Sequence, residues 1–146
     1  MPTDDFVAIS RLVHRYADAV AHRDGDQWAS CWAEDATWDL GRGRLVEGRD
    51  AIVALWHEAM GGMAAVVQMA HNGDVAAGAD GDHATGRWYI DERFRRADGT
   101  NQILLAHYED AYVRTADGWR FSRRELRPLY VGAPDLTGDF LDAVAG

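Results

Sequence analysis

Four strand-like runs fill the second half of the chain, and they constrain the fold more than any other feature. They are rich in valine, isoleucine, threonine and aromatic residues and occupy residues 64–78, 82–96, 101–114 and 118–131. The separators are "ADGD", "ADGT" and "TADG", and Asp-Gly pairs favour tight hairpin turns. The sequence therefore predicts a long antiparallel meander.

The first half of the chain has helical spacing instead. An apolar stripe at three- and four-residue intervals predicts a first helix ending near Arg23. A short second helix is expected within residues 27–35 and a third at about residues 49–60. Helices followed by an antiparallel sheet predict an α+β fold, and we expect one domain spanning residues 1–146.

A long twisted sheet curls, and helices can close one side of it. We therefore expect a cone-shaped α+β barrel, with three N-terminal helices packed on a strongly curved antiparallel sheet. The apolar interior of such a cone suits a hydrophobic small molecule.

Charge and composition exclude several classes of binding partner and location. The formal net charge of −9 argues against nucleic acid and anionic membranes, because both bind basic surfaces. The chain has neither a long apolar run nor a basic-then-apolar leader, so we expect no membrane span and a cytoplasmic location. Cys31 is the only cysteine, which excludes an internal disulfide.

Motifs for metals and nucleotides are missing from the sequence. The "HEAMG" segment at residues 57–61 lacks the second histidine of a zinc motif, and "GRG" lacks the dinucleotide fingerprint. We therefore expect chemistry without a metal or a cofactor.

Several segments together resemble a known superfamily. They are "RYADAVAHRDGDQWASCWAEDATWDL", "EGRDAI", "AHNGDV", "ATGRWYIDE" and "YEDAYVRTADGWRF". In these segments the chain is similar to the SnoaL-like branch of the nuclear-transport-factor-like superfamily, and within it resembles scytalone dehydratase and bile-acid dehydratase. That superfamily contains isomerases, dehydratases, epoxide hydrolases and binding modules, so the resemblance is specific for the fold and general for the reaction.

The resemblance implies a set of site residues. The pocket tyrosine of the first helix corresponds to Tyr16, the strand histidine to His71 and an acidic position to Glu92. The helix carboxylate of the dehydratases corresponds to Ala21, and a pocket serine falls near His107. The arrangement therefore departs from that of the relatives.

More distantly, the chain resembles ketosteroid isomerase. Tyr16 matches the oxyanion-hole tyrosine of that enzyme, whereas its general-base aspartate corresponds to Leu40, one place after Asp39. An offset of one residue in a strand turns a side chain to the opposite face, so Asp39 replaces that base only if a bulge intervenes.

The leading hypothesis is a cofactor-independent lyase or isomerase that acts on a hydrophobic cyclic ketone, a steroid or a polyketide-like compound. Tyr16 would hold the carbonyl, His71 would transfer the proton, and His107 or Glu92 would assist the leaving group. His107 can do so only if its face of the strand lines the cavity, rather than the face of Tyr108. The indoles of Trp38, Trp56 and Trp88, with Asp39, would bind the substrate.

Other interpretations stay open. Tyr16 and the tryptophans could belong to an ordinary core, and His71 could be a structural strand residue. Epoxide hydrolysis needs an Asp, Arg, Asp cluster, for which "DER" at residues 91–93 supplies only a reversed fragment. A non-catalytic binding or assembly module is the third alternative. By resemblance we also expect a homodimer that pairs through the exposed face of the sheet.

Overall fold

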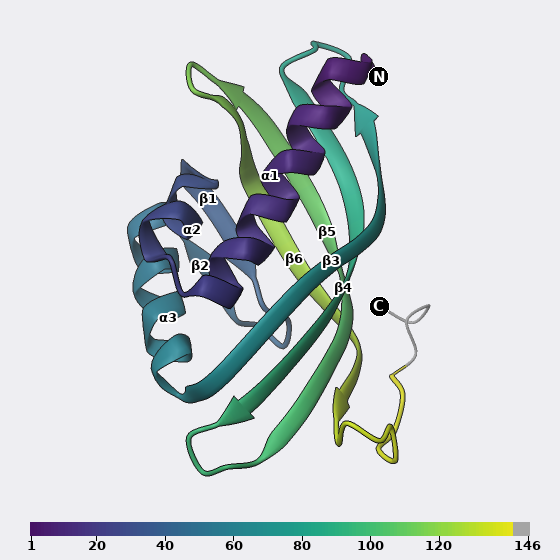
Figure 1. Cartoon of the computed structure of the whole chain (residues 1–146). Coiled ribbons are helices and arrows are strands. Elements are labelled where there is room, and N and C mark those ends of the chain that lie inside the picture. Colours follow the sequence, from purple (N-terminus) through teal and green to yellow (C-terminus); the bar gives the residue numbers. More distant parts are fainter. Residues whose placement is uncertain (142–146) are drawn as a thin grey trace.

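The structure is a computed structural model that describes residues 1–141 of the chain. In it, three helices cover one face of a six-stranded sheet (Figure 1). The helices are α1 (Thr3–His22), α2 (Gly25–Ser30) and α3 (Arg49–Gly61). The strands are β1 (Trp32–Asp39), β2 (Leu45–Glu47), β3 (Met63–Ala77), β4 (His83–Arg96), β5 (Asn101–Thr115) and β6 (Gly118–Gly132). This arrangement is the predicted α+β cone.

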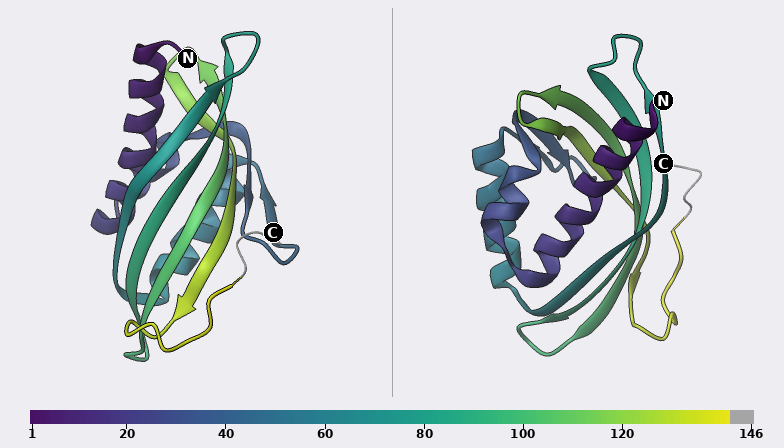
Figure 2. Two further views of the ribbon diagram at one scale, coloured as in Figure 1. Left: turned by 90° about the vertical axis from the view of Figure 1, so that its right-hand side faces the viewer. Right: turned by 45° about the horizontal axis from the view of Figure 1, so that its top comes forward.

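The sheet has the strand order β2-β1-β6-β5-β4-β3. Strands β3 to β6 form the predicted antiparallel meander. Strand β1 joins the meander by pairing in parallel with β6, a long-range contact for which the sequence offers no local signal. The sheet curls around the helices without closing, as the views in Figure 2 show.

The segment of the second helix differs from the sequence prediction. Helix α2 ends at Ser30 and β1 begins at Trp32, so the helix expected within residues 27–35 is shorter and lies earlier. Asp24 caps α2 by accepting a hydrogen bond from the Gln27 amide at 3.0 Å. For the last segment, residues 133–146, the sequence suggests either a short helix or a tail; residues 133–141 contain no helix, and residues 142–146 lie outside the described part of the chain.

The core joins the apolar stripe of α1 to aromatic side chains from α2, β1 and β6. Trp28, Trp32 and Phe121 are fully buried against Tyr16. Cys31 lies beside them with 1% of its surface exposed. Burial raises the pKa of its thiol to about 11.

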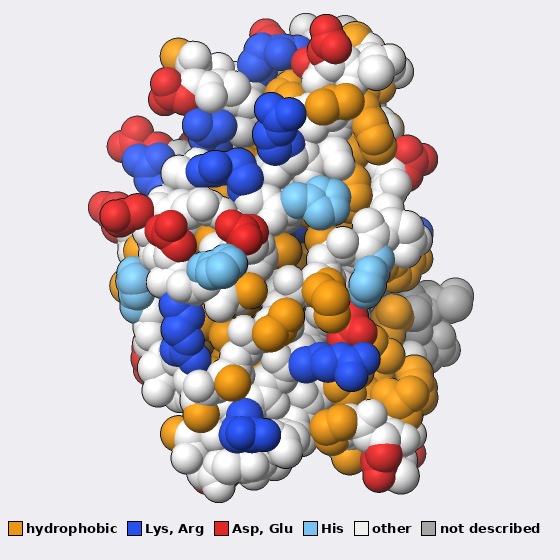
Figure 3. Space-filling model, viewed as in Figure 1, with side chains coloured by type: hydrophobic (Ala, Val, Ile, Leu, Met, Phe, Trp, Pro, Cys, Tyr) orange, Lys and Arg blue, Asp and Glu red, His pale blue; other side chains and the backbone are white. Residues whose placement is uncertain are grey.

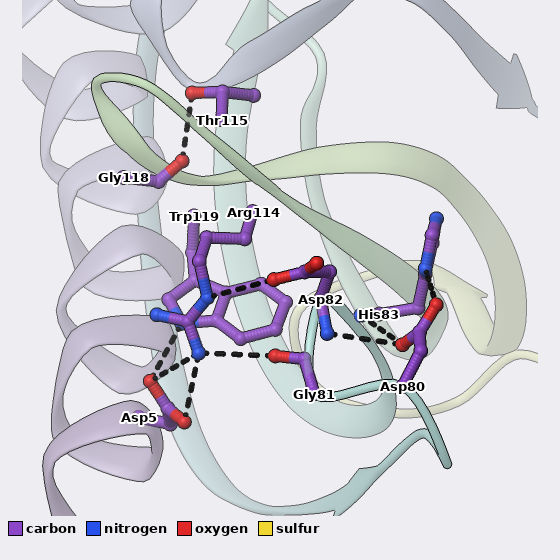
Figure 4. A network of polar contacts seen from close by, with 9 residues as sticks. All are labelled: Asp5, Asp80, Gly81, Asp82, His83, Arg114, Thr115, Gly118 and Trp119. Atoms are coloured by element: carbon purple, nitrogen blue, oxygen red, sulfur yellow. Dashed lines mark hydrogen bonds and ion pairs between the residues drawn. The ribbon is translucent and has the colours of Figure 1, made fainter.

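The N-terminal end of α1 is closed by a polar network (Figure 4). The Asp5 carboxylate accepts hydrogen bonds from the Arg114 guanidinium at 3.0 Å and from the Trp119 indole at 3.1 Å. Arg114 also donates to the Gly81 carbonyl at 3.0 Å and pairs with Asp82 at 3.3 Å. One guanidinium therefore ties α1 to the β3–β4 and β5–β6 hairpins.

The surface over the helices mixes acidic and basic side chains, whereas apolar side chains gather beside α1 and toward the lower right of the view (Figure 3). Val67 and Met69 on β3 are among the exposed apolar residues. None of the described helices is both long and apolar enough to cross a bilayer.

Candidate active site

A cavity of about 420 Å³ lies between the helices and the inner face of the sheet. Most of its lining is apolar or aromatic, with contributions from α1, α3 and every strand of the meander. The lining residues are Tyr16, Val20, Trp38, Leu40, Arg44, Leu55, Trp56, Ala59, Met60, Met63, Gln68, Glu92, Leu104, Tyr108 and Leu126. Its size falls within the usual range for small-molecule sites.

Two polar pairs interrupt this apolar lining. The hydroxyls of Tyr16 and Tyr108 lie 3.5 Å apart. The Gln68 carboxamide donates a hydrogen bond to Glu92 at 2.7 Å. Both pairs are buried, and each joins residues that are far apart in the sequence. The fold therefore assembles hydroxyl, carboxyl and amide groups around one apolar space.

Some polar atoms of the lining have no hydrogen-bond partner within the described residues. They are Oε1 of Gln68 and the indole nitrogens of Trp38 and Trp56. A buried polar group without a partner costs about 1–3 kcal/mol, so such groups are uncommon in a finished core. The indole nitrogens of Trp28, Trp32 and Trp88 outside the lining also lack partners, so what sets the cavity apart is the Gln68 oxygen beside an open space.

Burial raises the pKa of the Glu92 carboxyl, and the hydrogen bond from Gln68 opposes that shift. Burial also raises the pKa of the Tyr16 hydroxyl well above its ordinary value. A carboxyl with a raised pKa is a stronger base when it is ionised and a ready proton donor when it is not. Glu92 is therefore suited to proton transfer.

A buried ion pair supports the two tyrosines. Arg124 donates to Asp110 through two hydrogen bonds, at 2.8 and 3.0 Å, and Tyr112 donates to the same carboxylate at 2.8 Å. The Arg124 guanidinium carbon lies 3.6 Å from the ring centroid of Tyr108 and 4.4 Å from that of Tyr16. This cation fixes both rings and favours negative charge near them.

The structure brings four of the predicted site residues together. Tyr16, Glu92, Trp38 and Trp56 all line the cavity. Their chemical roles stay predictions, because lining a cavity does not by itself define a function.

His71 does not reach the cavity, and its expected placement was wrong. Val66 and Gln68 face inward from β3, so strand alternation turns His71 outward, where it is exposed. It also lies in a bulge, because β3 takes three steps from Ala70 to Gly73 while β4 takes two from Ile90 to Trp88.

His107 also lies outside the cavity, on the outer face of β5. The inward face of this strand belongs to Tyr108, Asp110 and Tyr112, the alternative that the sequence left open. His107 packs against Tyr89, with its Nδ1 3.3 Å from a Glu109 oxygen. Burial lowers the pKa of this imidazole.

Trp88 and Asp39 are not part of the cavity lining either. Trp88 points inward but packs under α1 against Phe6 and His14. It leaves no space for a side chain at position 73, where a Cβ atom would lie 2.3 Å from its ring, so Gly73 is required there. Asp39 accepts hydrogen bonds from Arg123 and Gly41, while its neighbour Trp38 lines the cavity.

The helix that carries Tyr16 supplies no carboxylate to the cavity. Ala21, the position of the dehydratase carboxylate, is exposed, and Val20 is the lining residue beside it. The residues of the "DER" fragment point to opposite faces of β4. Asp91 and Arg93 pair with one another on the outer face, whereas Glu92 lines the cavity.

Gln68, Tyr108 and Arg44 were missed as site residues. Alternation along β3 and β5 could have revealed the first two, because they share their faces with buried apolar neighbours. Arg44 belongs to a turn, and no strand or helix pattern predicts its direction. Within the described residues there is no cluster of three or more groups that could hold a metal ion.

Three helices on a strongly curved sheet, with an apolar cavity between them that holds a few polar groups, define the nuclear-transport-factor-like class of fold. Within that class, the chain belongs to the family of the SnoaL-like domain, whose model matches residues 2–125.

Solved structures of this class are similar over most of the chain. An aromatic ring hydroxylase candidate of Novosphingobium aromaticivorans is 27% identical, with a TM-score of 0.84 over 90% of this chain and 94% of the other. A scytalone dehydratase candidate of the same species is 22% identical, with a TM-score of 0.81 over 94% and 91% of the two chains. A hexachlorocyclohexane dehydrochlorinase of Novosphingobium barchaimii is 19% identical, with a TM-score of 0.81 over 95% and 94%.

Proposed function

We propose that this protein is a cofactor-independent lyase that removes water from a hydrophobic cyclic β-hydroxy ketone, such as a polyketide-like or steroid-like compound. The observation that carries the proposal is the buried carboxyl of Glu92 in one apolar cavity with the paired hydroxyls of Tyr16 and Tyr108. Two of the similar structures are described as a dehydratase and a dehydrochlorinase, names that denote eliminations. These descriptions support the reaction class.

The reaction begins with proton abstraction. The Glu92 carboxylate takes the proton from the carbon next to the carbonyl, and the electron pair moves toward the carbonyl oxygen. Of the two hydroxyl hydrogens of Tyr16 and Tyr108, one joins the pair and the other is free to donate to that oxygen. Arg124 beneath the two rings stabilises the negative charge that develops there.

The reaction ends with loss of the hydroxyl. As the enolate re-forms its carbonyl, the carbon–oxygen bond breaks and the Glu92 carboxylic acid gives its proton to the leaving hydroxyl. One water leaves, and Glu92 returns to the carboxylate. Among the described lining residues Glu92 is the one carboxyl, so the same group serves first as base and then as acid.

A double-bond isomerase shares the first step. A single carboxyl that returns its proton to a different carbon would move the double bond without changing the mass of the substrate. Mass spectrometry of the product separates the two reactions, because only elimination releases water.

The test uses a β-hydroxytetralone, which gives a naphthol when it loses water. We expect the purified protein to form the naphthol, followed by its absorbance. Glu92→Gln should lower the rate about 10²- to 10⁴-fold, the usual scale for a general acid-base group. His71→Ala is the matched control, because His71 is exposed and outside the cavity; its rate should equal that of the wild type.

Two results would contradict the proposal. One is a Glu92→Gln protein that folds and keeps the full rate. The other is turnover that stops in oxygen-free buffer, which would favour the hydroxylase description of one similar structure. Circular dichroism of both variants checks that their folds are intact.

A further inference from the structure

Leu40 and Arg44 form one edge of the cavity, called here its mouth, at a glycine-rich turn between β1 and β2. The turn is the "GRGR" segment, residues 41–44. Gly41, Arg42 and Gly43 all have positive φ angles, of 79°, 55° and 76°. Glycine is suited to this conformation at positions 41 and 43 because it has no Cβ atom. The turn is closed by a hydrogen bond from the Leu40 amide to the Arg44 carbonyl at 3.0 Å.

This turn places Arg44 at the boundary between two spaces. Arg44 and Leu40 line the cavity, and both also line an adjoining groove. Arg42, Arg96 and Asp139 line the same groove. The apolar cavity therefore shares its mouth with a groove that carries three arginines and one carboxylate among its described residues.

The three arginines of the groove have no carboxylate partner. They belong to the nine arginines, of fifteen in the chain, that form no ion pair within 4.0 Å among the described residues. Arg44 donates to the Leu40 carbonyl at 3.2 Å, and Arg96 donates to the amide oxygen of Gln102 at 2.9 Å. Most of the donors of the exposed Arg44 side chain are thus free to bind either solvent or a ligand.

The charge of the mouth contrasts with that of the whole chain, whose formal net charge is −9. Glu92 is the one carboxyl among the described lining residues of the cavity, and its burial disfavours the negatively charged form. A carboxylate matches the planar fork of an arginine guanidinium and can accept two parallel hydrogen bonds from it. The cavity and its mouth together suit a molecule that is apolar at one end and anionic at the other.

We infer that the ligand of this cavity is an amphipathic acid, with its ring system among the aromatic side chains and a carboxylate on Arg44. This inference rests on the proposed function for its cavity but concerns binding alone. It narrows the substrate class from neutral cyclic ketones to ring compounds that carry a carboxylate remote from the reacting carbon. Arg44 is the residue that determines this specificity.

The experiment compares two probes of nearly the same shape, the anionic naphthylacetic acid and the neutral naphthylacetamide. Isothermal titration calorimetry at pH 7.5 gives the Kd of each. We expect the acid to bind the wild type about tenfold more tightly than the amide, a difference typical of one charge-assisted arginine contact. Arg44→Gln should bring the acid to the affinity of the amide and leave the amide unchanged.

Arg11→Gln is the matched control. Arg11 is exposed on α1, lies outside the cavity lining and has no ion pair within the described residues. Its affinities for both probes should equal those of the wild type. The inference is overturned if the wild type binds the two probes equally or binds neither, or if Arg44→Gln weakens both to the same extent.

The binding experiment and the test of the lyase proposal can fail separately. The two naphthyl probes do not react, so their affinities do not depend on turnover. A selective effect of Arg44→Gln on the acid, with no effect of Glu92→Gln on catalysis, would leave the anionic subsite standing and remove the lyase. An effect of Glu92→Gln on catalysis, with no selective effect of Arg44→Gln on the acid, would support the lyase and remove the anionic subsite.

Discussion

The polar groups around the two ends of α1 differ in whether they have hydrogen-bond partners. At the N-terminal end, Asp5, Arg114 and Trp119 bind one another, and Arg114 also binds Gly81 and Asp82. At the other end, Gln68, Trp38 and Trp56 present atoms without partners to a cavity. The polar network makes the first end a finished structural joint, although the indole nitrogen of the nearby Trp88 has no partner, and the cavity makes the second end the incomplete one. The difference points to function more directly than the identity of any single residue.

Between these ends lies the buried pair Arg124–Asp110, which should be the most sensitive point of the molecule. Arg124→Met leaves the Asp110 carboxylate buried without its cation and should lower the free energy of unfolding by about 3–5 kcal/mol. Urea denaturation measures this. The double variant Arg124→Met/Asp110→Leu should lose less than the single variant; an equal or larger loss would show that packing, rather than the unpaired charge, causes the effect.

The contribution of the incomplete end to the free energy of unfolding should depend on pH. Burial raises the pKa of Glu92 in the folded protein above its ordinary value of 4.5, so the folded state holds this proton more tightly than the unfolded chain. The stability from this proton is complete below about pH 4.5 and falls as the pH rises through the raised pKa. The difference in unfolding free energy between the wild type and Glu92→Gln should therefore fall with rising pH, by at most about 1.4 kcal/mol per pH unit.

This dependence is measured by urea denaturation of both proteins from pH 4 to 8. A difference that stays constant over this range would show that Glu92 is not held in its protonated form by the fold.

Gln68 joins the same end of the molecule and should matter for chemistry more than for stability. Gln68→Leu removes a buried oxygen without a partner and, with it, the hydrogen bond to Glu92. These effects oppose one another, so the unfolding free energy should change by less than about 1 kcal/mol. Turnover of the β-hydroxytetralone should fall about tenfold, because Glu92 loses the group that orients it. Steady-state kinetics and urea denaturation test both parts, and unchanged turnover would contradict this role.

The finished end should give the smallest effect. Arg114 is 40% exposed, and partly exposed ion pairs contribute little. Arg114→Gln should lower the Tm by about 2–4 °C, and the affinity for naphthylacetic acid should not change. Calorimetry of unfolding and of binding gives both values. A loss of affinity would show that the two ends of α1 are coupled.

The sequence predicts the frame of this molecule well where the signal is local. The Asp-Gly turns and strand-like runs indicate the meander, and the helical stripe indicates α1. The parallel pairing of β1 with β6 has no such signal, because it joins segments far apart in the chain. The segments that resemble the SnoaL-like family predict the family correctly, and its model matches residues 2–125. The homodimer stays a prediction, and equilibrium sedimentation showing only a 16.2 kDa species would remove it.

The site is predicted less well, for reasons of strand geometry. Tyr16 and Glu92 lie where the resemblance implies, but His71 and His107 face away, because one step along a strand reverses the direction of a side chain. The resemblance assigns positions without establishing register. Gln68 and Tyr108 then occupy the inner face, and neither attracts attention as a catalytic residue type on its own.

The single thiol of the chain has a practical use. Cys31 is sealed between α2 and β1, and the thiolate that reacts with disulfide reagents is scarce at neutral pH because burial raises its pKa to about 11. Labelling of this sulfur should therefore require the molecule to open. The rate of thiol trapping at low denaturant reports how often the helical wall separates from the sheet. A bound ligand that slows this rate would be detected without a known reaction, a chromophore or an engineered tag.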